Sequence, residues 1–188
     1  MFRIGIITGS TRPNRKSLDV ARWVLEIATK TKQNDVEYEL VDIENFELPL
    51  LDEPMPPAMG NYQKPHTRQW AAKIASLDAF VFVTPEYNHG IPAALKNAID
   101  FLFAEWNHKA AGFVSYGSAG GARAVEQLRL VLAEVHVATV RAQVCLSIYS
   151  DFENFTTFTP GPQHEKTVGS VFDQVIAWGR ALKQLRSS

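Results

Sequence analysis

The sequence predicts an α/β fold built on a parallel sheet, and three observations support it. Short apolar runs alternate with segments of helical periodicity, which is the pattern of successive strand–helix–strand units. The run over residues 79–84 is continuously apolar, as is typical of a central strand that helices cover on both faces. No repeat or linker interrupts the 188 residues, so we expect a single domain over residues 1–188.

The first half of the chain predicts two strands and two helices. Residues 2–8 are almost all apolar and predict a short buried strand, and residues 37–42 predict a second one. An apolar face at helical spacing predicts a helix over residues 17–32 between them. Residues 47–67 contain five prolines and are too long for an ordinary connection, so we expect a functional loop before a helix over residues 67–76.

The second half continues the alternation after the central strand. Pro92 suits the first position of a helix, and the segment after it predicts a helix that reaches residue 103. Residues 111–115 predict a fourth strand, and residues 122–135 predict the helix that follows it. The remaining expectations are a fifth strand over residues 139–146, a long aromatic loop over residues 147–163 and a last helix over residues 164–185.

Composition restricts the functional class. The formal net charge is -1, so no overall basic field attracts nucleic acid or an anionic membrane. The single cysteine, Cys145, fits a reducing compartment, and we interpret it as a core residue. The N-terminal apolar run breaks at once into a polar, basic loop and is typical of neither a signal peptide nor a membrane span. We therefore expect a cytoplasmic protein.

Three loops leave the carboxyl ends of the expected strands, where ligands bind in open α/β sheets. They read GSTRPNRKS over residues 9–17, PEYNHGI over residues 85–91 and YGSAGG over residues 116–121. All three are rich in glycine, hydroxyl, amide or aromatic residues. Their convergence predicts one ligand site at this edge of the sheet.

The first of these loops has the composition of a phosphate-binding loop, but it does not fit three common kinds. A nucleoside triphosphate loop needs glycine directly before the lysine, and here Arg15 precedes Lys16. A dinucleotide loop needs G-x-G-x-x-G, and Gly9 stands alone. A low-molecular-weight phosphatase places a cysteine nucleophile six residues before an arginine, and this loop contains no cysteine.

What remains is a compact phosphate monoester at the N-terminus of the helix that follows. Backbone amides and the helix dipole favour an anion there. The hydroxyl groups of Ser10, Thr11 and Ser17 can donate to it. Arg12 and Arg15 can form charge-assisted bonds worth roughly 1.5–3 kcal/mol each. The alternative is that these cations are solvated surface charges.

The other two loops suit the flat ring of FMN. Backbone amides of residues 86–88 can reach ring carbonyls and nitrogens, and Tyr87 can pack its own ring nearby. Gly117, Ser118 and Gly121 allow the backbone to approach a ligand closely. A phosphate monoester that carries a flat, polar-edged ring, as FMN does, would suit all three loops.

Together the motifs resemble the NADPH-dependent FMN reductases of flavodoxin-like fold. GSTRPNRKS, TPEYNHGIPAALKNAIDFL and SYGSAGGARAVEQLR follow one another in the order and spacing of that family, and the similarity covers nearly the whole chain. The resemblance implies a three-layer flavodoxin-like sandwich with a five-stranded parallel sheet of order 2-1-3-4-5. It also implies an enzyme that uses FMN with NADPH, or NADH, to reduce quinones, free flavin, azo compounds or metal oxyanions.

The resemblance further implies a set of cofactor-binding residues. The first loop holds the phosphate of FMN, the second lines the isoalloxazine ring, and the third closes the ring pocket. The implied residues are Ser10, Arg12, Arg15, Lys16, Ser17, Pro85, Glu86, Tyr87, Asn88, Tyr116, Gly117, Ser118 and Gly121. Many relatives place a small residue and an asparagine around the serine of the first loop. Whether Lys16 and Ser17 contact the phosphate therefore stays open.

By the same resemblance the flavin carries the chemistry, because its N5 atom receives hydride from NADPH before an acceptor replaces the nucleotide. The protein then needs no acid or base, so we assign no catalytic residue. A lone loop histidine such as His89 is more typical of a structural or solvent-facing role, and proton transfer by His89 or Glu86 stays open. The histidines show no zinc-ligand spacing, so we expect no metal.

The family also implies an assembly, and two other functions stay open. We expect a homodimer or a homotetramer made of dimers, in which the proline-rich segment helps one chain to cover the flavin of another. A flavodoxin-type electron carrier would bind FMN without NADPH turnover, and a sensor module would keep the fold without flavin. Such carriers are usually strongly acidic, whereas this chain is nearly neutral.

Overall fold

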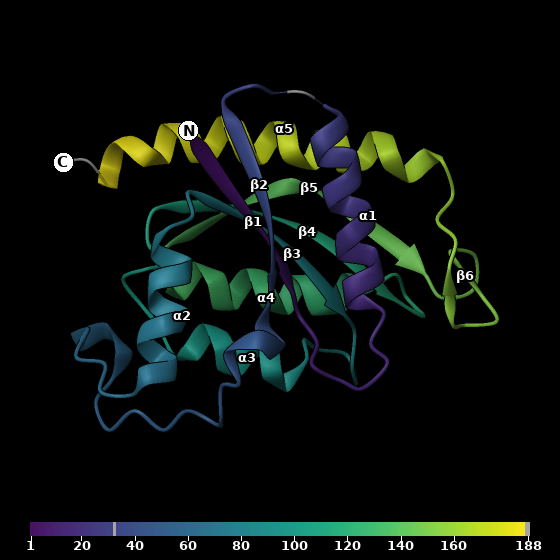
Figure 1. The fold of residues 1–188 in the computed structure, drawn as a ribbon. Coiled ribbons are helices and arrows are strands. Elements are labelled where there is room, and N and C mark those ends of the chain that lie inside the picture. Colours follow the sequence, from purple (N-terminus) through teal and green to yellow (C-terminus); the bar gives the residue numbers. More distant parts are fainter. Residues whose placement is uncertain (32, 187–188) are drawn as a thin grey trace.

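A five-stranded parallel sheet forms the centre of the protein, and helices cover both of its faces (Figure 1). The computed structural model describes residues 1–31 and 33–186. The strands are β1 (Phe2–Thr8), β2 (Val36–Asp42), β3 (Ala79–Pro85), β4 (Lys109–Gly117) and β5 (Val137–Ser147). Their order is β2-β1-β3-β4-β5, with every neighbouring pair parallel. The predicted fold class and strand order are therefore confirmed.

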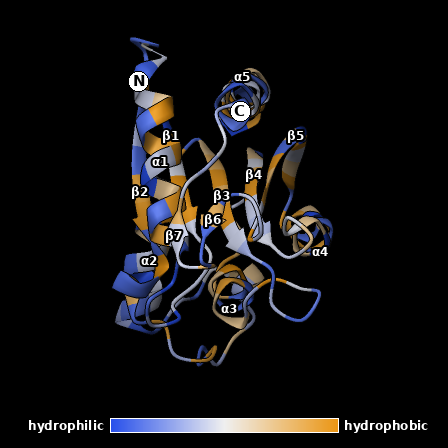
Figure 2. Ribbon diagram, turned by 90° about the vertical axis from the view of Figure 1, so that its right-hand side faces the viewer, coloured by the Kyte–Doolittle hydropathy of each residue, from blue (hydrophilic) through white to orange (hydrophobic). Residues whose placement is uncertain are grey.

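The helices divide between the two faces of the sheet. Helices α1 (Ser17–Lys30) and α5 (Gln163–Lys183) cover one face, and α2 (Pro65–Ala75), α3 (Ala93–Asp100) and α4 (Ala122–Glu134) cover the other (Figure 1). Two apolar cores result, because successive strand residues point to opposite faces. Hydrophobic residues concentrate on the strands and on the inner sides of the helices (Figure 2). All residues of β3 are buried, as expected for its central place.

Three sequence expectations about local structure are wrong. The helix expected to reach residue 103 ends at Asp100, because the chain turns there to bury Phe101 and Leu102 in the core. Pro92 lies at the cap position before that helix and not at its first residue. Cys145 is exposed and not in the core, because β5 lies at the edge of the sheet. The first helix is expected to end at residue 32, which lies outside the described residues.

The segment expected to be a long aromatic loop contains an antiparallel hairpin. Its strands are β6 (Phe152–Glu153) and β7 (Thr157–Phe158). The Phe158 ring packs against Phe152 at 5.1 Å and against Trp23 of α1 at 5.5 Å between centroids. Aromatic packing therefore fixes the hairpin beside the N-terminal half of α1.

The proline-rich segment follows β2 and crosses in front of α3. It contains two short turns of 3₁₀ helix, η1 (Ile43–Phe46) and η2 (Pro57–Met59). Asn97 of α3 holds it in place: its side-chain amide donates to the Pro49 carbonyl at 2.6 Å, and its oxygen accepts from the Leu51 N–H at 2.9 Å. Within residues 1–31 and 33–186, none of the helices combines the length and apolar character that crossing a bilayer requires.

Candidate functional site

A cavity of about 540 Å³ lies at the carboxyl ends of the central strands, where all three predicted loops meet. Its size is typical of a site for a small organic ligand. The predicted residues that line it are Arg12, Arg15, Lys16, Pro85, Glu86, Tyr87, Tyr116, Gly117 and Ser118. The parallel sheet brings these loops together because it directs the ends of β1, β3 and β4 to one edge.

Three predicted residues, Ser10, Ser17 and Gly121, lie behind this lining and support it. The Ser10 hydroxyl lies 3.0 Å from the Tyr87 hydroxyl, so a hydrogen bond joins the first loop to the second. Ser17 is fully buried at the start of α1. Gly121 has a φ of 73°, and a Cβ there would come within 2.8 Å of the Tyr116 backbone nitrogen. The remaining predicted residue, Asn88, is exposed in the turn of the second loop and does not line the cavity.

The cations of the first loop differ in their partners. Arg15 forms ion pairs with Asp42 and Glu44 at the end of β2. Burial opposes its charge, but the two carboxylates raise the pKa of Arg15 above its ordinary value. In the part of the chain that the structure describes, Arg12 and Lys16 form no ion pair. The uncompensated positive charge of the cavity therefore comes from Arg12 and Lys16.

The N-terminus of α1 is prepared for an anion. No side chain caps its first turn, so the free N–H groups there have no side-chain acceptor. The buried Ser17 hydroxyl lies beside the Tyr116 side chain and has no acceptor at hydrogen-bond distance among the described atoms. Because buried polar groups are normally hydrogen-bonded, this hydroxyl is available to donate to a ligand. A phosphate would supply acceptors for these donors.

The second loop is a tight turn with a strained backbone. The Tyr87 N–H donates to the Gly90 carbonyl at 2.9 Å, and the Gly90 N–H donates back to Tyr87 at 3.0 Å. Between them, Asn88 has a φ of 49° and His89 a φ of 70°. A left-handed backbone at two non-glycine residues is unusual, although Asn and His tolerate it best. The turn directs Tyr87 toward the cavity and places His89 at its exposed edge.

Glu86 is fixed as a carboxylate by Arg123, a residue that the sequence analysis missed. Arg123 Nε donates to Glu86 at 2.6 Å, and the backbone N–H groups of Arg123 and Ala124 donate to it at the start of α4. Burial opposes the charge, but these bonds hold the pKa of Glu86 below its usual range. Nη1 of Arg123 also lies 2.8 Å from Nε2 of His89. Arg123 thus ties the second loop to α4.

The far wall of the cavity comes from the segment after β5, which the sequence analysis did not assign to the site. Ile148, Phe152, Phe155 and Thr156 line it. The aromatic content of residues 147–163 was the only sequence signal for this wall. Burial, reinforced by nearby Tyr87, raises the pKa of Tyr116 and keeps its hydroxyl protonated. The wall after β5 is therefore largely apolar, and the Tyr116 side chain beside it is uncharged.

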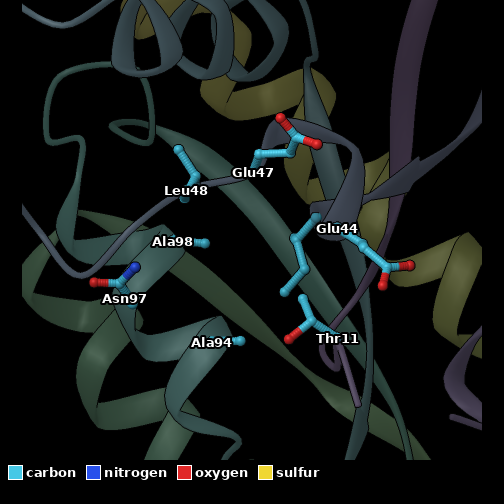
Figure 3. Close-up of a pocket in the computed structure, with 8 residues that line it drawn as sticks. Thr11, Glu44, Glu47, Leu48, Ala94, Asn97 and Ala98 are labelled. Carbon is cyan, nitrogen blue, oxygen red and sulfur yellow. The ribbon is translucent and has the colours of Figure 1, made fainter. Parts of the chain in front are cut away.

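A second cavity of about 310 Å³ lies on the opposite side of the first loop, between α3 and the start of the proline-rich segment. Thr11 separates it from the larger cavity, and Ala94 and Ala98 form its helical side. Figure 3 shows that the carboxylates of Glu44 and Glu47 point away from these alanines. Thr11 and Asn97 still contribute polar groups, so the lining of this second cavity is mixed.

The fold and the site define an α/β protein with a doubly wound sheet and a ligand-sized cavity at the carboxyl ends of its central strands. The family described as NADPH-dependent FMN reductase matches residues 2–151. An NAD(P)H-dependent FMN reductase of Schizosaccharomyces pombe is 36% identical over 188 residues, covering 99% of this chain and 86% of that protein. One of Nectria is 42% identical over 132 residues, or 68% of this chain and 66% of that protein.

Solved structures agree on the fold. The flavoenzyme NAD(P)H:(acceptor) oxidoreductase FerB of Paracoccus denitrificans superimposes with a TM-score of 0.71 at 19% identity, covering 98% of each chain. This chain therefore belongs to the NADPH-dependent FMN reductase family. It is an NAD(P)H-dependent oxidoreductase with FMN as its cofactor, and the activity and cofactors expected from the sequence are confirmed.

The residues of the larger cavity fit FMN. The unpaired cations and the uncapped start of α1 suit its phosphate, and the unpartnered Ser17 hydroxyl provides a further donor. The backbone of residues 86–88 and the close approach at Gly117 suit a flat polar-edged ring. The chemistry of the donors thus agrees with the family.

Proposed function

We propose that the larger cavity holds FMN and that the protein passes electrons from NADPH or NADH to a small acceptor. The observation that carries this proposal is the meeting of all three sequence motifs around one cavity. Arg12, Lys16, Ser17 and the start of α1 hold the phosphate. The segments Pro85–Asn88 and Tyr116–Gly121 hold the ring, and Arg15 supports the first loop from behind.

When bound, FMN supplies the two-electron chemistry, taking hydride from the nicotinamide and giving it to the acceptor. The side chains bind and orient the reactants. The Ser10–Tyr87 hydrogen bond keeps the phosphate loop and the ring loop at a fixed separation. Glu86 stays ionised through Arg123, so it does not supply a proton near neutral pH. We therefore assign no side chain as a general acid.

The acceptor is a small molecule that enters the open side of the cavity. Quinones, free flavin, azo compounds and metal oxyanions meet that description, and none requires a protein partner. The protein acts in the cytoplasm as a homodimer, or as a tetramer made of dimers. Neither nucleic acid nor a membrane takes part.

The first test is an absorption spectrum of the purified protein, followed by NADPH in the absence of oxygen. We expect a flavin spectrum, after incubation with FMN where the cofactor has been lost, that bleaches when NADPH is added. A flavin spectrum that persists would indicate the electron carrier. Failure to bind FMN at all would contradict the proposed site.

The charge assignment predicts different effects for the cations of the first loop. Replacing Arg12 and Lys16 together by Ala removes the uncompensated charges, so we expect FMN binding to weaken by about tenfold or more. Arg15→Ala leaves the buried Asp42 without its cation, so its main effect is a lower free energy of unfolding. Fluorescence titration with FMN and urea unfolding measure the two effects. Equal loss of FMN in both variants would make Arg15 a direct phosphate ligand.

A further inference from the structure

The tip of the β6–β7 hairpin contains a phenylalanine where a turn of this kind favours glycine. The Thr156 N–H donates to the Glu153 carbonyl at 3.0 Å and closes the turn. The two residues between them, Asn154 and Phe155, have φ values of 49° and 59°. Such a turn needs a left-handed backbone at both central positions, and glycine is preferred at the second. For a bulky side chain this conformation is a genuine outlier.

Burial does not compensate for the strain at Phe155. Its side chain is largely exposed, at 63%, although it lines the larger cavity. Its closest aromatic neighbour is Tyr149, itself 68% exposed, with ring centroids 5.9 Å apart and an interplanar angle of 85°. Strained residues at the edge of a binding cavity are typical of functional positions.

The hairpin holds Phe155 at the rim of the cavity, and Tyr149 lies just before the hairpin in the chain. Phe152 and Phe158 are buried or half-buried at the base of the hairpin and pack against each other. Asp151 accepts hydrogen bonds from the Ser147 and Gly161 N–H groups and so joins the two ends of the segment. A fixed base with an exposed aromatic tip is a preformed surface for stacking, because little conformational entropy is lost on binding.

We propose that Phe155, supported edge-on by Tyr149, is a stacking platform for the adenine ring of NAD(P)H. This inference rests on the proposed function. The residues proposed to hold FMN come from the three loops, whereas Phe155 lies on the β6–β7 hairpin, at the exposed rim of the same cavity. A ligand can reach that rim while reacting inside the cavity only if it carries a second flat ring far from its reactive ring. NAD(P)H has two such rings, whereas a one-ring quinone acceptor has only one.

The test is Phe155→Gly, because this variant should stabilise the fold while it weakens the binding of NADPH. Glycine relieves the left-handed strain, so we expect the melting temperature to rise by about 2–4 °C. It also removes the stacking surface, so we expect the KM for NADPH to rise about tenfold. The KM for a one-ring quinone acceptor and the Kd for FMN stay within about twofold of the parent values.

Two variants serve as controls for the turn and for the ring. Asn154→Gly introduces the same flexibility at the neighbouring strained position but keeps the Phe155 ring, so we expect a parental KM for NADPH. Phe155→Trp keeps a flat ring on the strained backbone, and we expect it to retain a KM close to the parental one. An increase in the KM with both glycine variants would assign the effect to hairpin flexibility and overturn the proposal.

The remaining outcomes also decide the question. Loss of FMN from Phe155→Gly would place the ring against the cofactor and overturn the proposal, as would an increase confined to the KM for the acceptor. A change in sedimentation alone would make Phe155 an interface residue and overturn it too. If the parent neither binds FMN nor oxidises NADPH, the proposed function fails. A fully active parent with an unaffected Phe155→Gly variant refutes the platform alone.

Discussion

At the scale of single residues, the structure contains a buried lysine that takes no part in the proposed reaction. Lys109 begins β4 and is 3% exposed. Its ammonium group donates to the Ile74 carbonyl at 2.7 Å and lies 5.4 Å from the centroid of the Phe80 ring. Burial, with the nearby charge of Arg186, lowers the pKa of Lys109 to about 7. Keeping this side chain charged therefore costs folding free energy.

The sign of its pH dependence follows from the direction of the shift. The pKa of Lys109 is about 7 in the folded state and 10.5 ordinarily, so the unfolded state binds more protons between these values. The penalty is complete below about pH 7 and disappears as the pH rises toward 10.5. Lys109→Met should raise the free energy of unfolding by on the order of 2–4 kcal/mol near neutral pH. The gain should shrink steadily in alkaline buffer.

Urea unfolding of parent and variant across the alkaline range checks this prediction. The matched control is Lys96→Met, because Lys96 is half exposed and paired with Asp100 on the surface of α3. We expect the stability difference between Lys96→Met and the parent to vary little with pH. Parallel stability profiles for the parent and Lys109→Met would show that the pKa of Lys109 is the same in the folded and unfolded states, and so would contradict the prediction.

At the scale of elements, a buried carboxylate fastens the segment that carries the far wall of the cavity. Asp151 is 2% exposed and accepts hydrogen bonds from the Ser147 N–H at 2.8 Å and the Gly161 N–H at 3.2 Å. Nε2 of His164, in the first turn of α5, lies 2.9 Å from it. One side chain therefore joins the end of β5, the exit of the hairpin and the start of the last helix.

This carboxylate predicts a loss of stability in acid. Burial opposes its charge, but the hydrogen bonds from Gly161 and Ser147 hold the pKa of Asp151 below its ordinary 3.8. Its contribution is therefore complete above pH 3.8 and is lost as the pH falls through the lower folded value. Asp151→Asn should lower the free energy of unfolding by about 1–3 kcal/mol near neutral pH. The difference from the parent should narrow in acid.

Denaturant unfolding in neutral and acidic buffers measures the difference. Glu153→Gln provides the control, since this carboxylate lies exposed in the same hairpin. We expect Glu153→Gln to follow the parent at every pH. A stability difference between Asp151→Asn and the parent that does not change with pH would mean that the carboxylate charge contributes nothing.

The elements also show how far the sequence alone predicts this molecule. The strands and the three loop motifs are local patterns, so periodicity and composition place them within a few residues. The partners of side chains are not local. Asp42 reaches Arg15 because the parallel register sets it beside Thr8, and Arg123 reaches Glu86 because α4 begins next to the end of β3. The hairpin was missed because each of its strands has only two residues, too few to show alternation.

At the scale of the whole molecule, the proline-rich segment presents apolar side chains to solvent. Leu50 is 83% exposed and Met59 is 62% exposed, and the hydrogen bonds of Asn97 hold this segment against α3. The second cavity, whose lining is mixed, lies beside it. Exposed apolar groups on a fixed support are typical of an interface between proteins. A second copy of this chain is the occupant that the family resemblance implies.

The assembly can be tested by charging this surface. We expect the parent to sediment as a dimer or tetramer at micromolar concentration. A stable interface buries about 1,200–2,000 Å² in total, and the exposed apolar side chains of the proline-rich segment would lie within it. Leu50→Asp should shift the distribution toward monomer, since an aspartate cannot be buried there without a partner for its charge. Leu130→Asp is the matched control, because Leu130 is 76% exposed on α4, away from the proline-rich segment. A parent that sediments only as monomer would refute the assembly, and dissociation by Leu130→Asp in place of Leu50→Asp would move the interface to α4.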